Sequence, residues 1–438
     1  MVQIKGEPMD LLYANDKRGH YPKSYWASVA TPLAPFPPLK GAVKADVCVV
    51  GAGFTGLSSA LHLAEAGYKV VVLEAQRVGF GASGRNGGQV GSGQRVEQDD
   101  LEKMVGEDKA RALWGLGEAS KDCVRGLIAK HGIDCDWRDG VLHAELKPKH
   151  LHHSVAYAEM LQTRYGYDAI SALDGAAIRQ HVGSDAYCGG TLDMGAGHLN
   201  PQKYVLGLAR AAQKAGVEIY EGSKALSYTG TVVTTERGRV SADFLILAGN
   251  GYMGGLSKKV ARRVMPINNF IIATEPLGEE MAKSLVAEDV AVADSKFVVN
   301  YFKRSADHRM VFGGGESYGY KFPADIAAKA QKPMLEIFPQ LAGVKIDYAW
   351  GGTLAITMNR MPNFARLAPD ILSASGYSGH GVAMASLAGE ILAETIQGTS
   401  ERFDLFGSTK PPRFPGGPAL RTPLLALAMS YYALRDRI

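Results

Sequence analysis

Three glycines and one carboxylate have the types and the spacing of a phosphate-binding site. Gly51, Gly53 and Gly56 follow the pattern G-x-G-x-x-G, and Glu74 lies downstream. The first glycine of such a pattern permits a tight turn, the second lets a pyrophosphate approach the backbone, and the third allows close helix packing. A carboxylate about twenty residues further on can accept the hydroxyl groups of a ribose. Because Glu74 would repel the extra phosphate of NADP, the pattern predicts a dinucleotide that lacks it.

The elements that must position these residues are a strand, a helix and a second strand. Residues 46–50 are mainly apolar and β-branched, as in a strand buried on both faces. Apolar residues within 57–64 recur at the helical spacing i, i+3, i+4, i+7, and Gly67 ends that helix. Residues 70–73 predict a second buried strand before the carboxylate. This complete order is far more specific than the glycines alone, for which the alternative is a turn without a ligand.

A second glycine-rich loop follows at residues 75–89, AQRVGFGASGRNGGQ. Its composition is incompatible with a regular helix or strand. Ser83, Arg85, Asn86 and Gln89 supply hydrogen-bond donors within it. Glycines at this density let backbone N–H groups bend around a flat polar ligand. The alternative is a flexible loop without a ligand, which its place directly behind the dinucleotide motif disfavours.

A third element repeats the order of strand, glycine loop and helix near the end of the chain. Residues 371–375 predict a strand, GYSGHGV follows at 376–382, and apolar residues within 384–392 recur at helical spacing. The amino end of the helix predicts a second anion-binding position on the same ligand. His380 lies in that loop and is a candidate to contact the ligand; the alternative is a loop spacer.

The motifs at residues 51–75 and 79–89 resemble the FAD-dependent D-amino-acid oxidase superfamily, which includes sarcosine and glycine oxidases. The form GASGRNGGQ is most similar to its gamma-glutamylputrescine oxidoreductase branch. The resemblance implies FAD rather than NAD. In sarcosine oxidases and some relatives a cysteine links FAD covalently. None of the four cysteines here lies in the C-terminal third, so we expect non-covalent FAD.

The resemblance also implies the site residues. For FAD it indicates Gly51, Gly53, Phe54, Thr55, Gly56, Glu74, Ala75, Gly81, Ala82, Ser83, Arg85, Asn86, Gly87, Gly88, Gln89, Leu226, Gly249, Gly379, His380, Gly381 and Val382. His380 and Trp350 are the candidate catalytic residues. Tyr301, Lys303 and Arg304, at the end of a predicted strand, are the candidates to contact a polar substrate, the alternative for each being an ordinary surface residue. No metal site is expected.

The fold implied is of the α/β (α+β) class, with an FAD-binding Rossmann-like domain of the glutathione-reductase type and a second, antiparallel-sheet substrate domain. The boundaries expected are an N-terminal arm at 1–40, a discontinuous FAD-binding domain at 41–110, 190–260 and 345–400, a substrate domain at 111–189 and 261–344, and a C-terminal tail at 401–438. Tyr21, Tyr25 and Trp26 are expected to anchor the arm. The substrate-domain strands include one expected at 297–301.

The function implied is oxidation of an amine C–N bond by FAD. A hydride passes to flavin N5, the imine is hydrolysed, and O₂ takes the electrons to give H₂O₂. The most similar branch implies gamma-glutamylputrescine, a substrate of polyamine catabolism, whose carboxylate Lys303 or Arg304 should receive. Three alternatives stay open: oxidation of a cyclic or N-methyl amino acid such as pipecolate, proline or sarcosine; a quinone-linked dehydrogenase; and a non-catalytic FAD-binding protein.

Composition excludes several other classes. The chain has 438 residues, a net charge of +4 and no run of lysine or arginine, so nucleic-acid binding is not expected. Its four cysteines lack C-x-x-C spacing, which is typical of a cytoplasmic protein with reduced thiols. No apolar run is long enough to cross a membrane. The apolar residues 424–434 are expected to dock on the body of the protein or on a second subunit, as in a homo-oligomer; the alternative is shallow attachment to a membrane surface.

Overall fold

Two β-sheets organise this computed structural model, which describes residues 10–317 and 319–415. The strands of the first sheet are β1 (Gly41–Val50), β2 (Val70–Leu73), β7 (Glu218–Tyr220), β8 (Ser227–Thr229), β9 (Val232–Thr234), β10 (Gly238–Leu247), β16 (Asn363–Ala368) and β17 (Ile371–Ser375). They lie in the order β16-β17-β10-β1-β2-β7, and β8 and β9 extend from β10. The pairs from β17 to β7 are parallel, whereas β16 is antiparallel to β17. The end of β1 therefore lies in the middle of the sheet.

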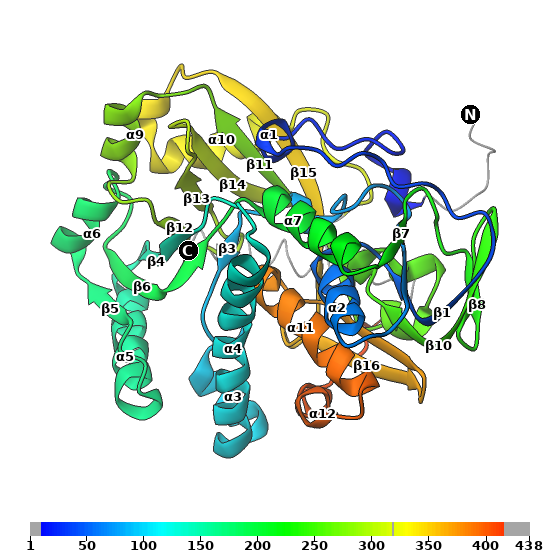
Figure 1. The fold of residues 1–438 in the computed structure, drawn as a ribbon. Coiled ribbons are helices and arrows are strands. Elements are labelled where there is room, and N and C mark those ends of the chain that lie inside the picture. Colours follow the sequence, from blue (N-terminus) through cyan, green and yellow to red (C-terminus); the bar gives the residue numbers. More distant parts are fainter. Residues whose placement is uncertain (1–9, 318, 416–438) are drawn as a thin grey trace.

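Helices cover one face of the first sheet. They are α2 (Phe54–Glu65), α4 (Glu107–His131), α7 (Pro201–Lys214) and α11 (Gly381–Ile396), which pack against one another (Figure 1). Their apolar sides close a core with Val47 and Val49 of β1. Cys48 and Val50 face the other way, into a second core that includes Val233 of β9. Because both faces are covered, β1 needs apolar residues at every position near its end, which is the pattern from which it was predicted.

The second sheet is built from strands that are far apart in the sequence. They are β3 (Gln89–Val90), β4 (Arg138–Glu145), β5 (Ile170–Leu173), β6 (Gly189–His198), β11 (Met265–Thr274), β12 (Ala291–Asp294), β13 (Tyr301–Arg304), β14 (Met310–Ser317) and β15 (Ile346–Ile356). Their order is β15-β11-β14-β13-β12-β4-β6-β3, with β5 beside β6. The pairs are antiparallel, except that β12 runs parallel to β4.

The two faces of this second sheet have different partners. Helices α6 (Gly175–His181), α9 (Glu279–Leu285) and α10 (Ile326–Ile337) close an apolar core on one face with Phe302 and Phe312. The other face carries an aromatic cluster in which Trp350 and Tyr301 pack with residues of the N-terminal arm. This second face is the one that meets the glycine-rich loops of the first half of the fold.

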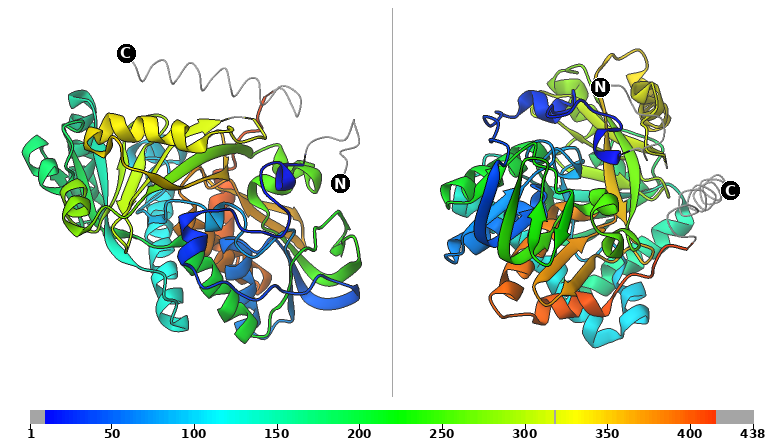
Figure 2. Two further views of the ribbon diagram at one scale, coloured as in Figure 1. Left: turned by 90° about the horizontal axis from the view of Figure 1, so that it is seen from above. Right: turned by 90° about the vertical axis from the view of Figure 1, so that its right-hand side faces the viewer.

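The N-terminal arm bridges the two halves of the fold (Figure 2). Tyr25 and Trp26, in α1 (Tyr25–Val29), are buried, and the Tyr21 hydroxyl donates to the carbonyl of Val78 at 2.8 Å. Asn15 donates to the carbonyl of Tyr320 on the other half at 2.7 Å. These contacts confirm the three aromatic residues as anchors. The remaining helices are η1 (Leu11–Tyr13), η2 (Ala82–Gly84), α3 (Gln98–Val105), α5 (Pro148–Tyr165), η3 (Asn250–Gly255), α8 (Lys258–Ala261), η4 (Pro339–Leu341) and α12 (Glu401–Ser408).

The fold class is as predicted, an α/β protein with a second, mainly antiparallel sheet, but sheet membership differs from the expected intervals in places. Strands β6 and β15 belong to the second sheet, although the intervals 190–260 and 345–400 assigned them to the FAD-binding domain. Helix α4 packs beside the first sheet, although most of it was assigned to the substrate domain. The apolar pattern of an element shows that it is buried and does not show against which sheet. Residues 424–434 lie outside the described residues.

The strand expected at 297–301 is wrong. Residues 295–300 form the connection between β12 and β13 instead. Asp294 closes this connection, because its carboxylate accepts the N–H of Asn300 at 2.9 Å and the side-chain amide of Asn300 at 2.8 Å. A side chain that bonds nearby backbone in this way competes with strand pairing.

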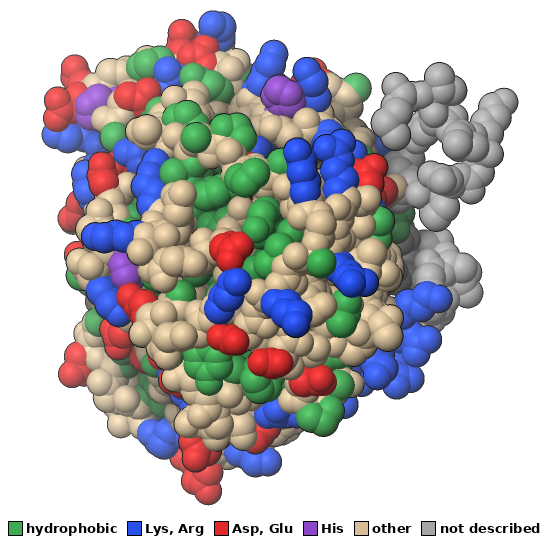
Figure 3. Space-filling view, turned by 45° about the vertical axis from the view of Figure 1, so that its right-hand side comes forward, with side chains coloured by type: hydrophobic (Ala, Val, Ile, Leu, Met, Phe, Trp, Pro, Cys, Tyr) green, Lys and Arg blue, Asp and Glu red, His purple; other side chains and the backbone are tan. Residues whose placement is uncertain are grey.

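The described surface shows no concentration of one charge on the face drawn in Figure 3, where basic and acidic side chains are interspersed. Within the described residues, no helix is both long enough and apolar enough to cross a membrane.

Candidate active site

The turn after β1 is closed tightly by its glycines. Gly51 has a φ of +108°, in the region that favours glycine. A Cβ at Gly56 would lie 1.8 Å from the carbonyl oxygen of Gly51, and a Cβ at Gly53 would lie 2.8 Å from Ser83 Oγ. Only glycine therefore allows α2 to start directly on the turn, with the second glycine-rich loop against it. Gly249 lies beside Gly51, whose Cβ would be 3.3 Å from the Gly249 Cα.

The amino ends of α2 and α11 lie next to each other, and in neither helix does the side chain of the N-cap residue, Gly53 or His380, accept a backbone N–H. Thr55 Oγ1, in the first turn of α2, is 2.6 Å from the hydroxyl oxygen of Tyr377, just before α11. The N–H of Phe54 donates to Ser83 Oγ at 3.0 Å, while the Phe54 ring packs on Tyr204 in the core. Two adjacent helix amino ends concentrate partial positive charge and free N–H groups, which suits an anion.

Glu74 is held at the end of β2 by the backbone. Its two carboxylate oxygens accept N–H groups of Ala52 and Gln76, each at 2.8 Å. Burial nevertheless raises the pKa of Glu74 to about 7. The carbonyl of Glu74 accepts the N–H of Ser223 at 2.8 Å, which brings the segment before β8 to this corner. In that segment Leu226 is 50% exposed, so an apolar surface lies open near the acidic residue.

The loop at 82–89 is shaped by two of its own side chains. The Arg85 guanidinium donates to the carbonyl of Phe80 at 2.6 Å and to Asp16 at 2.9 Å, so it ties the loop to the N-terminal arm. Its Nη2 is buried and has no hydrogen-bond partner among the described residues. Asn86 donates to the carbonyl of Ala82 at 2.9 Å and accepts the N–H of Gly88 at 2.7 Å. Most of the polar capacity predicted for a ligand is therefore used within the protein.

Trp350 holds this loop from the second sheet. Its Nε1 donates to the carbonyl of Arg85 at 3.0 Å, and its ring packs edge-on against Trp26, 6.1 Å between centroids. The side chain is 2% exposed. The position gives Trp350 a packing role, because its only polar group is occupied and its ring is enclosed. The catalytic role expected for it stays a prediction.

Tyr301 lies directly against the loop. A Cβ at Gly87 would be 2.7 Å from the Tyr301 ring, and the Tyr301 hydroxyl donates to Asn269 Oδ1 at 2.5 Å. Gln89, at the end of the loop, donates to the carbonyl of Val292 at 3.0 Å. The loop thus rests on β12 and β13 of the second sheet.

The two predicted carboxylate receivers point to opposite faces of β13. Lys303 faces the loop but is 5% exposed, and its ammonium donates to the carbonyl of Leu199 at 2.7 Å and lies 5.0 Å from the centre of the Trp26 ring. Burial lowers its pKa to about 8. Arg304 faces the other way and donates to the carbonyl of Ala287 at 3.3 Å. The expectation for Arg304 is corrected by this alternation, since it lies on the α9 side of the sheet.

His380 is the residue that precedes α11. Its Nε2 lies 3.2 Å from the carbonyl of Gly93, and a Cβ at Gly91 would be 2.9 Å from its ring. Burial lowers the pKa of His380 to about 4, so the imidazole is neutral near pH 7. The contact places residues 91–93, which continue from the glycine-rich loop, beside the amino end of α11.

Comparisons with known proteins identify the class of this site. Residues 46–395 match the family of FAD dependent oxidoreductases (DAO). The chain belongs to this family. It is 43% identical to the gamma-glutamylputrescine oxidoreductase of Escherichia coli (strain K12), over 95% of this chain and 98% of that protein. It is 42% identical to a probable oxidoreductase OrdL of Rhizobium meliloti (strain 1021), over 94% and 97%.

Solved structures share the fold of this FAD-dependent oxidoreductase. The glycine oxidase from Geobacillus kaustophilus has a TM-score of 0.71 at 18% identity and covers 85% of this chain and 100% of that chain. An L-proline dehydrogenase from P. horikoshii has a TM-score of 0.69 at 19% identity, over 85% and 100%. The resemblance stated from the sequence motifs is confirmed, as is the prediction of an FAD-dependent enzyme.

The residues present fit FAD. The tight turn at Gly51 and Gly53 would be filled by any side chain, and the neighbouring amino ends of α2 and α11 offer free N–H groups to its anionic parts. Glu74 can accept ribose hydroxyl groups, and the buried Nη2 of Arg85 lacks a partner. The individual FAD contacts stay predictions.

Two residues on this side of the second sheet were missed by sequence reasoning. His143 of β4 is paired with Ala293, which is paired with Tyr301, so all three share one face of the sheet. The side chain of His143 is exposed. Arg95, two residues beyond Gly93, is exposed as well. The alternation of β4 was a usable signal for His143, whereas nothing local in the sequence marks Arg95.

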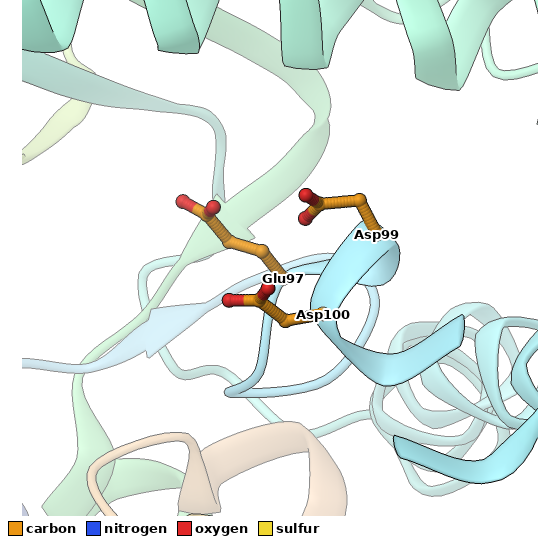
Figure 4. Close-up of side chains that lie close together, drawn as sticks. All are labelled: Glu97, Asp99 and Asp100. Atoms are coloured by element: carbon orange, nitrogen blue, oxygen red, sulfur yellow. The ribbon is translucent and has the colours of Figure 1, made fainter. Parts of the chain in front are cut away.

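The carboxylates of Glu97, Asp99 and Asp100 follow Arg95 in the sequence, and their oxygen atoms lie within 4.8 Å of one another (Figure 4). They are already paired, since His153 lies 2.6 Å from Glu97 and Lys103 bonds Asp99 and Asp100 at 3.1 and 2.8 Å. Two of the three residues are exposed to solvent, so we interpret the group as a solvated network of ion pairs rather than a metal site.

Proposed function

We propose that this chain is an oxidase of primary amines that acts on gamma-glutamylputrescine or a similar amine, with non-covalent FAD and with O₂ as electron acceptor. The observation that carries the proposal is the 43% identity to gamma-glutamylputrescine oxidoreductase over nearly the full length of both chains. The glycine-rich loop at 82–89 and its supports, Trp26 and Trp350, are consistent with a flavin bound between the two sheets.

When bound, FAD accepts two electrons from the carbon next to the substrate amine. The protein must hold it and prepare the substrate. Gly51, Gly53 and the amino end of α2 would receive its pyrophosphate, Glu74 its adenosine ribose, and the amino end of α11 the polar edge of its flavin.

The substrate amine reacts only when it is neutral, so the pocket must lower its pKa. His143 and His380 are compatible with this, because loss of hydration lowers the pKa of each imidazole, so that neither adds a charge near pH 7. The chain therefore supplies a surrounding in which an ammonium group loses its proton, without a dedicated catalytic base.

Non-covalent attachment is favoured by the state of the cysteines. Cys48 and Cys135 are buried, and burial raises the pKa of each thiol to about 12, so neither is a nucleophile near neutral pH. Burial also raises the pKa of Cys123 and Cys188. Precipitation with acid should release all the flavin into the supernatant. Yellow colour that stays with the pellet would contradict the proposal. The four free thiols also favour a cytoplasmic location.

The function is tested by anaerobic reduction of the purified holoprotein. Gamma-glutamylputrescine should bleach the flavin bands, whereas putrescine should do so more slowly and pipecolate, proline and sarcosine weakly or not at all. Admitting air should restore the bands with formation of H₂O₂. Bleaching by a cyclic or N-methyl amino acid alone would replace the proposed substrate, and reduction that only a quinone reverses would replace the proposed acceptor.

A further inference from the structure

An arginine without a counter-ion follows the glycine-rich loop at residues 82–89, here called the flavin loop. Arg95 makes no hydrogen bond and no ion pair with any described residue, and its side chain is exposed. The nearest carboxylate that acts on it is Glu97, which is bonded to His153 at 2.6 Å. Arg360, which carries the same charge, also acts on Arg95 electrostatically, and Arg95 in turn acts on His143 and His380.

The segment that carries Arg95 is held firmly. The N–H of Gly93 donates to Glu118 at 3.1 Å, and the side chain of Gln94 donates to the carbonyl of Leu113 at 2.8 Å. Both partners belong to α4. His380 contacts the same segment from α11. Arg95 therefore follows a fixed backbone segment that lies close in sequence to the end of the glycine-rich loop.

Arg95 and His143 share an unusual environment. Each side chain is accessible to solvent, yet each is surrounded by enough protein to lower its pKa through loss of hydration. His143 lies in the same row of the sheet as Tyr301, which touches the flavin loop. One face of β13, β12 and β4 thus carries Tyr301, which meets the loop, and His143, which interacts electrostatically with Arg95.

We propose that Arg95 binds the carboxylate at the end of the substrate opposite the reacting amine. The inference rests on the proposed function and deepens it. An arginine presents paired N–H donors that match a carboxylate, and an anion here would also relieve the repulsion between Arg95 and Arg360. Lys303 is occupied by Leu199 and Trp26, and Arg304 lies on the far face of the sheet, so neither competes for this role.

The test compares R95M and R95K with the wild-type holoenzyme. R95M should raise the KM for gamma-glutamylputrescine by between about tenfold and a hundredfold and leave that for putrescine, which has no carboxylate, unchanged. R95K keeps the charge without the paired donors and should lie between. The matched control is R237M, which removes an exposed arginine from the β9–β10 turn. An equal KM increase for both amines, or none for either, would overturn the assignment of Arg95.

A second measurement separates this inference from the proposed function. N-butylglutaramate keeps the amide and a carboxylate but has no amine to oxidise, and its binding is followed by the shift that it causes in the flavin spectrum. It should bind to wild type and R237M at least tenfold more tightly than to R95M, and N-butylpentanamide should bind all three alike. If wild type binds it in this way but does not oxidise gamma-glutamylputrescine, the proposed substrate fails and the role of Arg95 stands. If R95M binds N-butylglutaramate as wild type does, the role of Arg95 fails.

Discussion

The indole nitrogen of Trp350 donates to the backbone carbonyl of Arg85 at 3.0 Å, although 265 positions separate the two residues. The bond joins the second sheet to the loop on which the flavin is expected to rest. W350F removes the donor and leaves a buried carbonyl unpaired, which should lower the free energy of unfolding by about 1–3 kcal/mol. FAD should bind more weakly, while kcat of the FAD-saturated enzyme stays within about threefold of wild type.

The measurements are denaturant unfolding, FAD titration and steady-state kinetics with excess FAD. The kinetic result distinguishes a packing role from a catalytic one. A loss of kcat of two orders of magnitude in a variant that keeps its FAD affinity would mean that the Trp350 ring touches substrate after all.

The glycine at position 56 should tolerate no side chain. G56A places a methyl group 1.8 Å from the carbonyl of Gly51, so α2 must move away from the turn that receives the phosphates. We expect the protein to be purified without FAD, or with a Kd for FAD raised at least a hundredfold. G115A is the matched control, since a Cβ at this glycine of α4 meets nothing within 4 Å and alanine favours helices. Equal flavin content in both variants would contradict the role of the turn.

Lys303 should make the stability of the protein depend on pH in the alkaline range. Burial lowers its pKa from 10.5 to about 8, so between these values the unfolded chain holds a proton that the folded chain has lost. The contribution of this group to the free energy of unfolding therefore rises with pH across that window, by up to about 3 kcal/mol in total, and is lost as the pH falls through 8. The difference in unfolding free energy between wild type and K303M, measured at pH 7, 8, 9 and 10, isolates this effect from that of other groups. A difference that does not change with pH would show that the ammonium keeps its proton.

His380 should not contribute an inflection to the pH profile of the reaction near neutrality. Its pKa of about 4 leaves it neutral from about pH 5 upwards, so its charge is constant over the working range. H380Q should therefore show kcat/KM inflections at the same pH values as wild type, even if its rates are lower. The disappearance of an inflection between pH 6 and 7 in H380Q alone would mean that His380 titrates during catalysis.

Local patterns predicted the dinucleotide part of the fold because all its signals lie close together in the sequence. The strand, the glycines and the helix at 46–65 need only their neighbours to be recognised. The substrate side differs, because β4 forms one surface with β12 and β13, which lie more than a hundred residues further along the chain. Alternation along β13 indicates that Lys303 and Arg304 face opposite ways, but not which of them faces the flavin loop.

Residue type was a weaker guide to role than to location. Arg85 and Asn86 lie in the predicted loop, yet most of their hydrogen bonds are made within the protein. Lys303 and Arg304 were expected to receive the substrate carboxylate, a role that we now propose for Arg95. Arg95 lies in an irregular segment, so no periodic pattern in the sequence indicated it. Its position is set by tertiary contacts, those of Gly93 and Gln94 with α4 and of Gly93 with His380.

The two strands that flank β1 in the first sheet are synthesised at different times, because β2 follows β1 closely in the sequence and β10 comes much later. Val47 of β1 is paired with Val70 of β2 on one side and with Phe244 of β10 on the other, and α11 is made later still. A nascent chain on the ribosome can form the first turn and helix early, but it lacks the second helix amino end until residues near 381 have emerged. Ribosome-bound chains arrested before α11 should therefore fail to retain FAD. FAD therefore binds late, after synthesis of the chain is nearly complete. A shortage of FAD would then leave finished chains without cofactor rather than interrupt their synthesis.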